Sequence, residues 1–227
     1  MLETERRPLR VARTDQQGDG PIHGGHAAKR LLDVSVASIA LVLLAPLMLA
    51  IWVAIRITSP GPAIFKQERI GLHHRPFTMY KFRTMYVEST VDVHRDYVSR
   101  VANGKSTPVE GMYKLRSDPR ITRLGRWLRR TSIDELPQLC NVLRGEMSLV
   151  GPRPMLAWEA ELFSEAGHPR FHVLPGMTGL WQVSGRHRLP MTKALELDTE
   201  YVGRQSLAFD LLVLARTVPV VLRREGV

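Results

Sequence analysis

The longest apolar stretch of the chain covers residues 34–55 and contains no charged side chain. A straight helix over this stretch would be about 33 Å long, enough to cross a hydrocarbon core of about 30 Å. Lys29 and Arg30 precede the stretch and Arg56 follows it, so cations bound it on both sides. The pattern predicts a membrane-associated helix.

Pro46 lies in the middle of this predicted helix. Proline removes one backbone hydrogen bond and clashes with the preceding turn, so we expect two half-helices that meet at a kink. Basic residues mark the cytoplasmic side of a membrane segment, and here Lys29 and Arg30 stand on one flank, with Arg56 and Lys66 on the other. This distribution favours a re-entrant helix with both ends on the cytoplasmic face. The alternative is a kinked helix that crosses the membrane.

The remaining pattern mixes short strands and helices. Strands are predicted at 63–65 and 77–82, joined through Gly71, and the polar residues 86–118 are predicted to form a surface excursion. Apolar residues recur at helical spacing over 120–130, with arginines between them. Such a helix suits either a membrane interface or a core-facing position, and the adjacent membrane segment favours the interface.

The C-terminal stretch 207–224 is also apolar and is interrupted by Pro219. It either lies on the same membrane surface or closes the core. Residues 1–28 hold several arginines and glycines without apolar periodicity, and we expect them to form a mobile tail.

Composition narrows the class of protein and its partners. A chain of 227 residues with 44% hydrophobic residues can bury a core, which excludes a disordered chain. The formal net charge of +10 indicates anionic partners: nucleic acid, acidic lipid headgroups or phosphorylated small molecules. A single cysteine, Cys140, excludes an intrachain disulfide and a zinc site built from several cysteines.

Two adjacent carboxylates carry the clearest chemical signal. Ser132 and Glu135 match the spacing of a capping box, but Pro137 follows too closely for that register, and a helix that begins at Asp134 fits the proline better. Asp134 and Glu135, kept ionised by a helix N-terminus and nearby arginines such as Arg129, could serve as a nucleophile and a magnesium ligand.

Residues 151–154 read Gly-Pro-Arg-Pro, a proline-stiffened turn. It either presents the guanidinium of Arg153 to a phosphate or is an ordinary exposed turn. No Walker A, G-x-G-x-x-G, H-E-x-x-H or G-x-S-x-G motif occurs, which removes the commonest nucleotide-binding and hydrolase interpretations.

Four motifs in order indicate a family. They are YKFRTM at 80–85, SIDELPQL at 132–139, GEMSLVGPRP at 145–154 and PGMTGLWQVSGR at 175–186. Together they resemble the bacterial sugar transferases, the monotopic polyprenyl-phosphate phosphoglycosyl transferases. The resemblance covers about residues 29–227 and is to the short, exopolysaccharide-type form of the family, because no block of several membrane helices precedes the domain.

The resemblance implies transfer of a sugar 1-phosphate from a UDP-sugar to a polyprenyl (undecaprenyl) phosphate, with magnesium and release of UMP, which starts assembly of exopolysaccharide or another surface glycan. By motif match, Asp134 would be the nucleophile that forms a phosphosugar intermediate, and Glu135, together with Asp134, would hold the Mg2+. Substrate-binding positions implied by the resemblance are Lys81, Arg129, Arg153, Arg186 and Asp198. For Asp198, the solvated surface of an amphipathic helix predicts the same residue.

We therefore expect an α/β fold: a small catalytic domain, residues 58–227, held on the cytoplasmic face of a bacterial inner membrane. A re-entrant helix at 29–57, kinked at a proline, and amphipathic interfacial helices would bind membrane lipids. A nonenzymatic basic adaptor for lipid or nucleic acid is the alternative, weakened because base-reading motifs with interleaved aromatics are absent, so no nucleic acid partner is expected. A second alternative is a metal-dependent phosphohydrolase that uses the same two carboxylates. The sugar and the oligomeric state, including a homo-oligomer, stay open.

Overall fold

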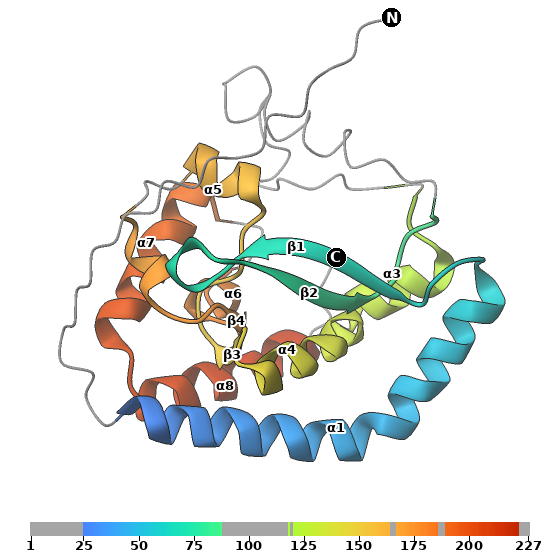
Figure 1. The fold of residues 1–227 in the computed structure, drawn as a ribbon, viewed down its shortest axis with the longest axis horizontal. Coiled ribbons are helices and arrows are strands. Elements are labelled where there is room, and N and C mark those ends of the chain that lie inside the picture. Colours follow the sequence, from blue (N-terminus) through green and yellow to red (C-terminus); the bar gives the residue numbers. More distant parts are fainter. Residues whose placement is uncertain (1–24, 88–117, 119, 164–166, 186–188, 223–227) are drawn as a thin grey trace, which may run out of the picture.

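The computed structural model describes residues 25–87, 118, 120–163, 167–185 and 189–222 (Figure 1). Residues 1–24 of the predicted tail and most of the predicted excursion 86–118 lie outside these residues. The elements mix helices with short strands, which confirms the expected α/β composition. In chain order they are α1 Gly25–Thr58, β1 Ile64–Ile70, the 3-10 turn Leu72–His74, β2 Pro76–Phe82, α3 Arg123–Arg130, the 3-10 helix Ile133–Gln138, α4 Leu139–Arg144, β3 Ser148–Val150, α5 Ala157–Phe163, the 3-10 helix Pro169–His172, β4 Gly176–Thr178, α6 Leu180–Val183, α7 Met191–Arg204 and α8 Leu207–Leu222.

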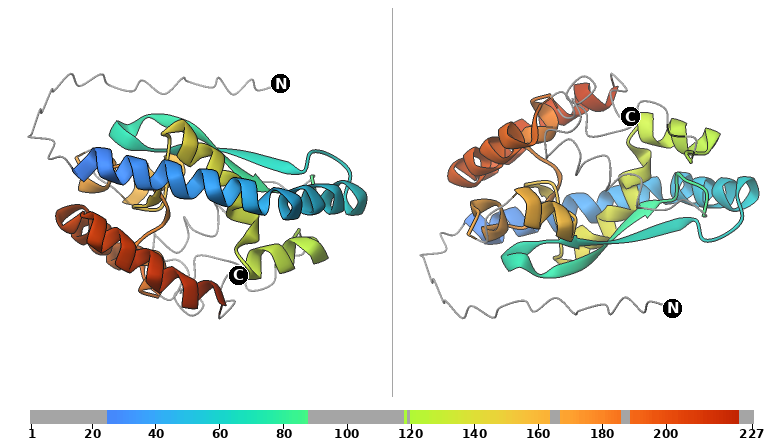
Figure 2. Two further views of the ribbon diagram at one scale, coloured as in Figure 1. Left: turned by 90° about the horizontal axis from the view of Figure 1, so that it is seen from below. Right: turned by 90° about the horizontal axis from the view of Figure 1, so that it is seen from above.

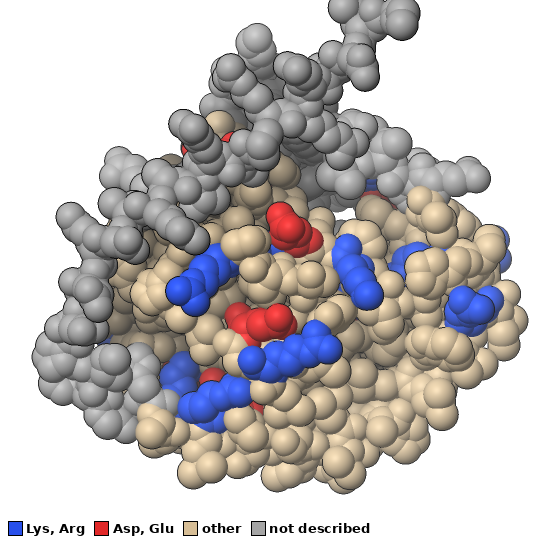
Figure 3. All heavy atoms as spheres, in the orientation of Figure 1, with Lys and Arg blue, Asp and Glu red and all other residues tan. Residues whose placement is uncertain are grey.

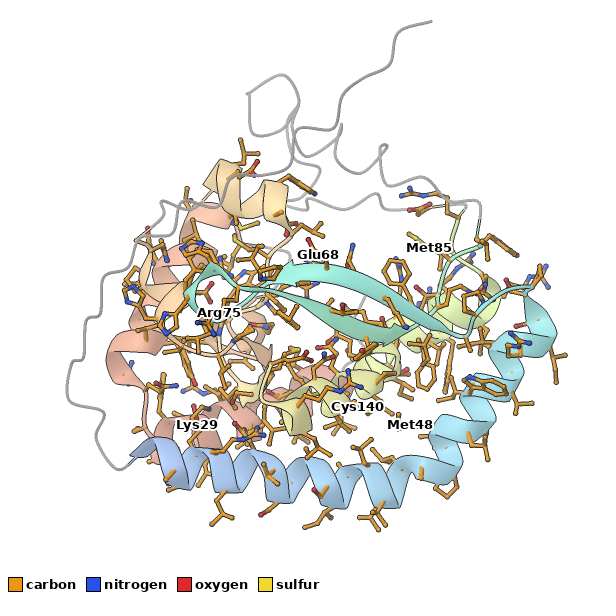
Figure 4. All side chains as sticks on the ribbon, viewed as in Figure 1. Lys29, Met48, Glu68, Arg75, Met85 and Cys140 are labelled. Atoms are coloured by element: carbon orange, nitrogen blue, oxygen red, sulfur yellow. The ribbon has the colours of Figure 1, made fainter. Side chains whose placement is uncertain are left out.

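Helix α1 is continuous and begins at Gly25, so residues 25–28, assigned to the tail from sequence, belong to it. It is long and apolar enough to cross a membrane, with a mean hydropathy of 2.6 in its most apolar window, of which 11% is buried. Pro46 lies inside it. The helix bends partway along its length (Figure 1), and Met48 lies at this bend (Figure 4).

Both ends of α1 pack against the rest of the molecule. Near its start, Lys29 Nζ lies 2.6 Å from Asp210 Oδ2 in α8, and Asp33 accepts a hydrogen bond of 3.0 Å from the Leu149 amide in β3. Near its end, Ile51 and Ile55 are buried in a cluster that also contains Phe82 and Leu128. The middle of α1 carries exposed apolar side chains, among them Ile39, Val42, Leu43, Leu47 and Leu49.

Helices α1 and α8 together form an apolar margin of the molecule. Seen from below, the two helices run side by side (Figure 2). Helix α8 buries Phe209 and Val213 in the main core and exposes Leu211, Leu212 and Val218. It therefore closes the core with one face, and its exposed face is apolar apart from Arg216. In Figure 3 the lower margin, where α1 lies, carries no charged side chain.

Strands β1 and β2 form an antiparallel hairpin whose register runs from Ile64 opposite Phe82 to Ile70 opposite Pro76. The second predicted strand is confirmed, but the first continues well beyond residue 65. Its exposed side chains, Lys66 and Glu68, interrupt the apolar pattern that a strand prediction depends on.

Strands β3 and β4 form a parallel pair that the sequence pattern did not predict. Glycines permit their close approach, because a Cβ on Gly176 would lie 2.0 Å from the Gly151 amide nitrogen. The pair is buried, and its position fixes the start of the Gly-Pro-Arg-Pro turn that follows β3.

Helix α3 begins at Arg123, later than predicted, because the Thr122 side chain accepts a 2.8 Å hydrogen bond from the Gly125 amide and caps it. Leu128 is fully buried and Leu124 packs against the same cluster, which confirms the core-facing interpretation for these two residues. Trp127 is 45% exposed. The polar face carries the arginines.

Candidate active site

Asp134 and Glu135 lie in the first turn of a 3-10 helix, Ile133–Gln138. The capping box is wrong: Ser132 has a left-handed backbone (φ 56°) and its side chain makes no cap hydrogen bond. The helix begins one residue before the predicted start at Asp134. Asp134 is buried, and the Glu135 side chain is 26% exposed.

Two cations approach one oxygen of Glu135. Lys81 Nζ lies 2.9 Å from Glu135 Oε1, and Arg153 Nη1 lies 3.8 Å from the same atom. Burial lowers the pKa of Lys81, and the charge of Glu135 opposes that shift. The structure therefore brings together three of the predicted site residues.

Asn141 fixes β2, which carries Lys81, against α4. Its Oδ1 accepts a 3.1 Å hydrogen bond from the Tyr80 amide, and its Nδ2 donates to the Thr78 carbonyl and to Glu146 Oε2, both at 2.7 Å. The side chain is completely buried. Because α4 follows directly on the helix with the two carboxylates, this contact sets the distance between Lys81 and Glu135.

Arg129, at the end of α3, borders the same site. Its Nε donates a 2.8 Å hydrogen bond to Thr84 Oγ1. Burial lowers the pKa of Arg129, and the negative charge of Asp134 acts in the opposite direction. The guanidinium is thus electrostatically linked to the predicted nucleophile.

A cavity of about 1040 Å³ joins these groups. Its charged lining includes Lys81, Arg129, Asp134, Glu135 and Arg153. Apolar side chains from β4, α6 and α8, among them Met177, Trp181, Leu214 and Val221, also line it. The cavity can therefore take a ligand that has both an anionic and an apolar part.

Two further site predictions have different outcomes. Arg186 lies outside the residues that the structure describes. Asp198 is 2% exposed and its Oδ2 lies 3.2 Å from Arg170 Nη2, so the alternative of a solvated helix surface is wrong for this residue. Burial raises the pKa of Asp198 to about 6, although Arg170 opposes the shift. Asp198 also lines the cavity.

Sequence reasoning missed several charged residues that line the cavity. Arg69 and Arg170 are buried and pair with Glu159 and Asp198, respectively. Their partners are distant in sequence, and no local pattern signals such pairs. Asp118 and Arg120 form an ion pair of 2.7 Å, and here the close spacing of opposite charges in the sequence was a signal that could have indicated the pair.

Asp134 and Glu135 are the carboxylates in this site that could hold a magnesium ion. Among the described residues no group of three or more His, Cys, Asp or Glu side chains is arranged to hold a metal ion. Magnesium in phosphate-transferring sites is commonly held by one or two carboxylates together with substrate phosphates and water. Asp134 and Glu135, beside cations that would bind those phosphates, match this donor chemistry.

Comparison with known proteins agrees with the motifs. The family model for "Bacterial sugar transferase" matches residues 24–224. A relative from Salmonella typhimurium, named undecaprenyl-phosphate galactose phosphotransferase, is 41% identical over 198 residues, covering 87% of this chain and 41% of the relative. The UDP-galactose-lipid carrier transferase of Erwinia amylovora is 43% identical over 207 residues, covering 90% of this chain and 42% of that protein.

A shorter relative covers more of its own length. The exopolysaccharide production protein ExoY of Rhizobium meliloti is 40% identical over 202 residues, which cover 89% of this chain and 88% of ExoY. The chain thus spans about two fifths of the two longer relatives and most of ExoY. The family resemblance expected from the four motifs is confirmed: the chain belongs to the bacterial sugar transferase family.

Proposed function

We propose that this chain transfers a sugar 1-phosphate from a UDP-sugar to undecaprenyl phosphate, releasing UMP and starting the assembly of exopolysaccharide or another surface glycan. The names of the relatives supply the substrate classes: a UDP-sugar, a lipid carrier and undecaprenyl phosphate. One observation carries the proposal. Asp134 and Glu135 line a single cavity with the cations Lys81, Arg129 and Arg153.

The cations are suited to the diphosphate of the donor substrate. Arginine can bind two phosphate oxygens at once through its planar guanidinium, and Lys81 contributes a compact charge. In the free enzyme Lys81 and Arg153 both face Glu135. Binding of the diphosphate would give these cations a second anionic partner and draw the phosphorus atoms toward the two carboxylates.

In the first step Asp134 attacks the phosphorus that bears the sugar. A bond forms between an Asp134 carboxylate oxygen and that phosphorus, the phosphoanhydride bond breaks, and UMP leaves with the bond electrons. The product is an aspartyl phosphosugar. Arg129, linked electrostatically to Asp134, would place a positive charge beside the attacking carboxylate and the phosphate that it attacks.

In the second step an oxygen of undecaprenyl phosphate attacks the same phosphorus, and the bond to Asp134 breaks. This restores the carboxylate and yields a lipid-linked diphosphosugar. Dividing the exchange into two displacements means that the two anionic substrates need not occupy the cavity together. Arg153 and Lys81 would stabilise the charge that develops on the phosphate oxygens in both steps.

Glu135, with Asp134, would hold magnesium beside the diphosphate. When bound, the ion supplies positive charge that offsets the charge developing on the transferred phosphate. Before the ion binds, Lys81 keeps Glu135 in place through the 2.9 Å contact.

We further propose that α1 is re-entrant and that the domain lies on the cytoplasmic face of the inner membrane. Support comes from the two ends of α1, since Asp33 near one end and Ile55 near the other are both buried against the same body of the molecule. A helix that crossed the bilayer would carry its ends to opposite sides. The exposed apolar faces of α1 and α8 would enter the membrane.

The same arrangement gives the lipid acceptor a route. Leu214, Thr217 and Val221 of α8 line the cavity, while Leu211, Leu212 and Val218 of the same helix are exposed. An acceptor whose chain lies in the membrane could therefore present its phosphate beside α8.

The experiment that tests the function uses the full chain in lipid nanodiscs with undecaprenyl phosphate and magnesium. UDP-glucose, UDP-galactose and their N-acetyl relatives are supplied one at a time, and UMP and the lipid product are measured. Lipid-dependent release of UMP with formation of lipid-linked diphosphosugar is expected for at least one donor. Release of free phosphosugar without lipid would indicate a phosphohydrolase instead, and no turnover with any donor would leave only the adaptor.

A further inference from the structure

The turn that carries Arg153 is held through its carbonyl groups. Pro152 and Pro154 have no N–H, so this turn has few donors with which to bind its surroundings. Three successive carbonyls accept hydrogen bonds instead. The Pro152 carbonyl accepts from the Gly176 amide at 2.9 Å, the Arg153 carbonyl from Arg170 Nη2 at 2.5 Å, and the Pro154 carbonyl from Arg69 Nη1 at 3.2 Å.

The two donor arginines are themselves buried and paired. Arg170 Nη2 lies 3.2 Å from Asp198 Oδ2, and the two side chains are 5% and 2% exposed. Arg69 Nη1 lies 3.4 Å from Glu159 Oε2, with side chains 8% and 18% exposed. These four side chains and Arg153 come from five different segments: β1, the turn, α5, the 3-10 helix Pro169–His172 and α7. Only the folded chain brings them together.

The pairing is electrostatically necessary. Burial lowers the pKa of Arg170, and Asp198 opposes that shift, while the nearby charge of Arg153 adds to it. A buried guanidinium beside another cation is costly unless a carboxylate compensates it. Without Asp198, Arg170 would be expected to withdraw toward solvent, and the Arg153 carbonyl would lose its donor.

We propose that Arg170 and Arg69 are positioning residues for Arg153, each held by a carboxylate: the buried Asp198 for Arg170 and the partly buried Glu159 for Arg69. Asp198 thus acts on the reaction through Arg170 and the Arg153 main chain, not by touching the substrate. The Pro152 carbonyl, held by the Gly176 amide, and the Arg153 carbonyl, held by Arg170, fix the main chain on the two sides of the Arg153 Cα, and with it the direction of the guanidinium toward Glu135. Arg69 holds the next carbonyl, that of Pro154. This inference rests on the proposed function for its kinetic test.

The kinetic test is a double-mutant cycle with Asp198→Asn and Arg153→Ala in the full chain in nanodiscs. We expect Asp198→Asn to lower kcat/KM for the UDP-sugar about tenfold in the wild-type background and less than about twofold when Arg153 is already Ala, since residues acting as one unit are not additive. Glu159→Gln should behave in the same way. An equal loss in both backgrounds would mean that Asp198 contacts the substrate directly, and would overturn the proposal.

A second measurement does not depend on activity. Amide hydrogen exchange of peptides covering residues 151–156 should be faster in Asp198→Asn than in the wild type, because the turn loses one of its three anchors. The matched control is Glu196→Gln, on the same helix but 64% exposed and paired only at the surface with Lys193 in the described part of the chain. It should leave both exchange and kcat/KM unchanged.

The kinetic cycle and the hydrogen-exchange experiment distinguish a failure of the positioning role from a failure of the proposed function. Unchanged exchange at 151–156 in Asp198→Asn would overturn the positioning role whatever the kinetics. If the wild type fails to transfer any sugar phosphate, the proposed function fails, and the exchange experiment alone then decides whether Asp198 holds the turn.

Discussion

Two cations, Lys81 and Arg153, lie near the same oxygen of Glu135. The closer contact is with Lys81, whose pKa burial lowers and Glu135 raises. Removing the negative charge of Glu135 therefore affects more than the magnesium binding proposed for it. It also makes the Lys81 ammonium easier to deprotonate.

We predict that Glu135→Gln moves the alkaline limb of the kcat/KM profile to lower pH, because Lys81 loses the charge that keeps it protonated. The variant should also need more magnesium for half-maximal rate. Rates measured across pH at saturating magnesium check the first effect, and a magnesium titration at fixed pH checks the second. An alkaline limb at its wild-type position would show that Lys81 does not depend on Glu135.

Arg153→Lys tests whether the planar guanidinium matters at this turn. The substitution keeps the charge and removes the paired donors, so we expect a loss of about 1 to 3 kcal/mol of transition-state stabilisation. The measurement is kcat/KM for the UDP-sugar. Arg126→Lys, exposed on α3, is the control. Full activity of Arg153→Lys would mean that the guanidinium of Arg153 is not required for the reaction and that the residue only forms part of the turn.

Asp198 makes stability depend on pH in a defined direction. Burial raises its pKa from 3.8 to about 6, so between these values the folded state binds more protons than the unfolded state. Its contribution to the free energy of unfolding is complete below the unfolded pKa and is lost as pH rises through the folded one, by about 3 kcal/mol in total.

The check is denaturant unfolding of the wild type and Asp198→Asn from pH 4 to pH 7. The wild type should lose stability relative to the variant as pH rises to about 6, and the difference should stay constant above it. A difference that grows in favour of the wild type over this range would mean that Arg170 outweighs burial and lowers the pKa of Asp198.

At the level of elements, the apolar run at 34–55 predicted α1, because helices and strands of water-soluble proteins rarely contain so long a stretch without a charged residue. The same reasoning could not find β3 and β4, since strands of three residues have no readable period. The same reasoning ended the first strand at residue 65, before Lys66, whereas β1 continues to Ile70. The polar side chains on the exposed face of β1 resemble those of a loop. The site was predicted where chemistry is local, at Asp134 and Glu135.

The residues that support the site were not predictable in this way. Arg170 follows a His-Pro sequence and reads as an exposed turn residue, although it is buried against Asp198. Pairs of this kind depend on which segments the fold places together, and a single sequence contains no signal for that. Asp198 was identified only through the family resemblance.

The topology of α1 is tested by single cysteines in a Cys140→Ser background. Ala27 and Thr58 are exposed positions near its two ends, whereas the neighbouring Ser59 is buried and unsuitable for labelling. In sealed inverted vesicles, Ala27→Cys and Thr58→Cys should both react with a membrane-impermeant thiol reagent. Labelling of only one of them in inverted vesicles and of the other in right-side-out vesicles would show that α1 crosses the membrane. Pro46→Leu should shift the helix toward crossing.

At the scale of the whole molecule, one cavity would serve both proposed substrates. The hairpin, the carboxylate helix and the Arg153 turn contribute charged side chains to it, and β4, α6 and α8 contribute apolar ones. Helix α8 belongs to both the cavity and the exposed apolar margin beside α1 (Figure 2). The reaction proposed for this cavity requires a covalent bond between protein and phosphosugar at a single named residue.

The most direct test of this claim is the intact mass of the full chain after incubation with UDP-sugar and magnesium, without lipid acceptor, followed by rapid quenching and peptide mapping. We predict an added phosphosugar on Asp134, its disappearance when undecaprenyl phosphate is supplied, and its absence in Asp134→Asn, which should also lose transfer. Glu135→Gln should still form the adduct, at a lower rate. An adduct on Glu135, or transfer by Asp134→Asn at a rate near that of the wild type, would contradict the assignment of the nucleophile.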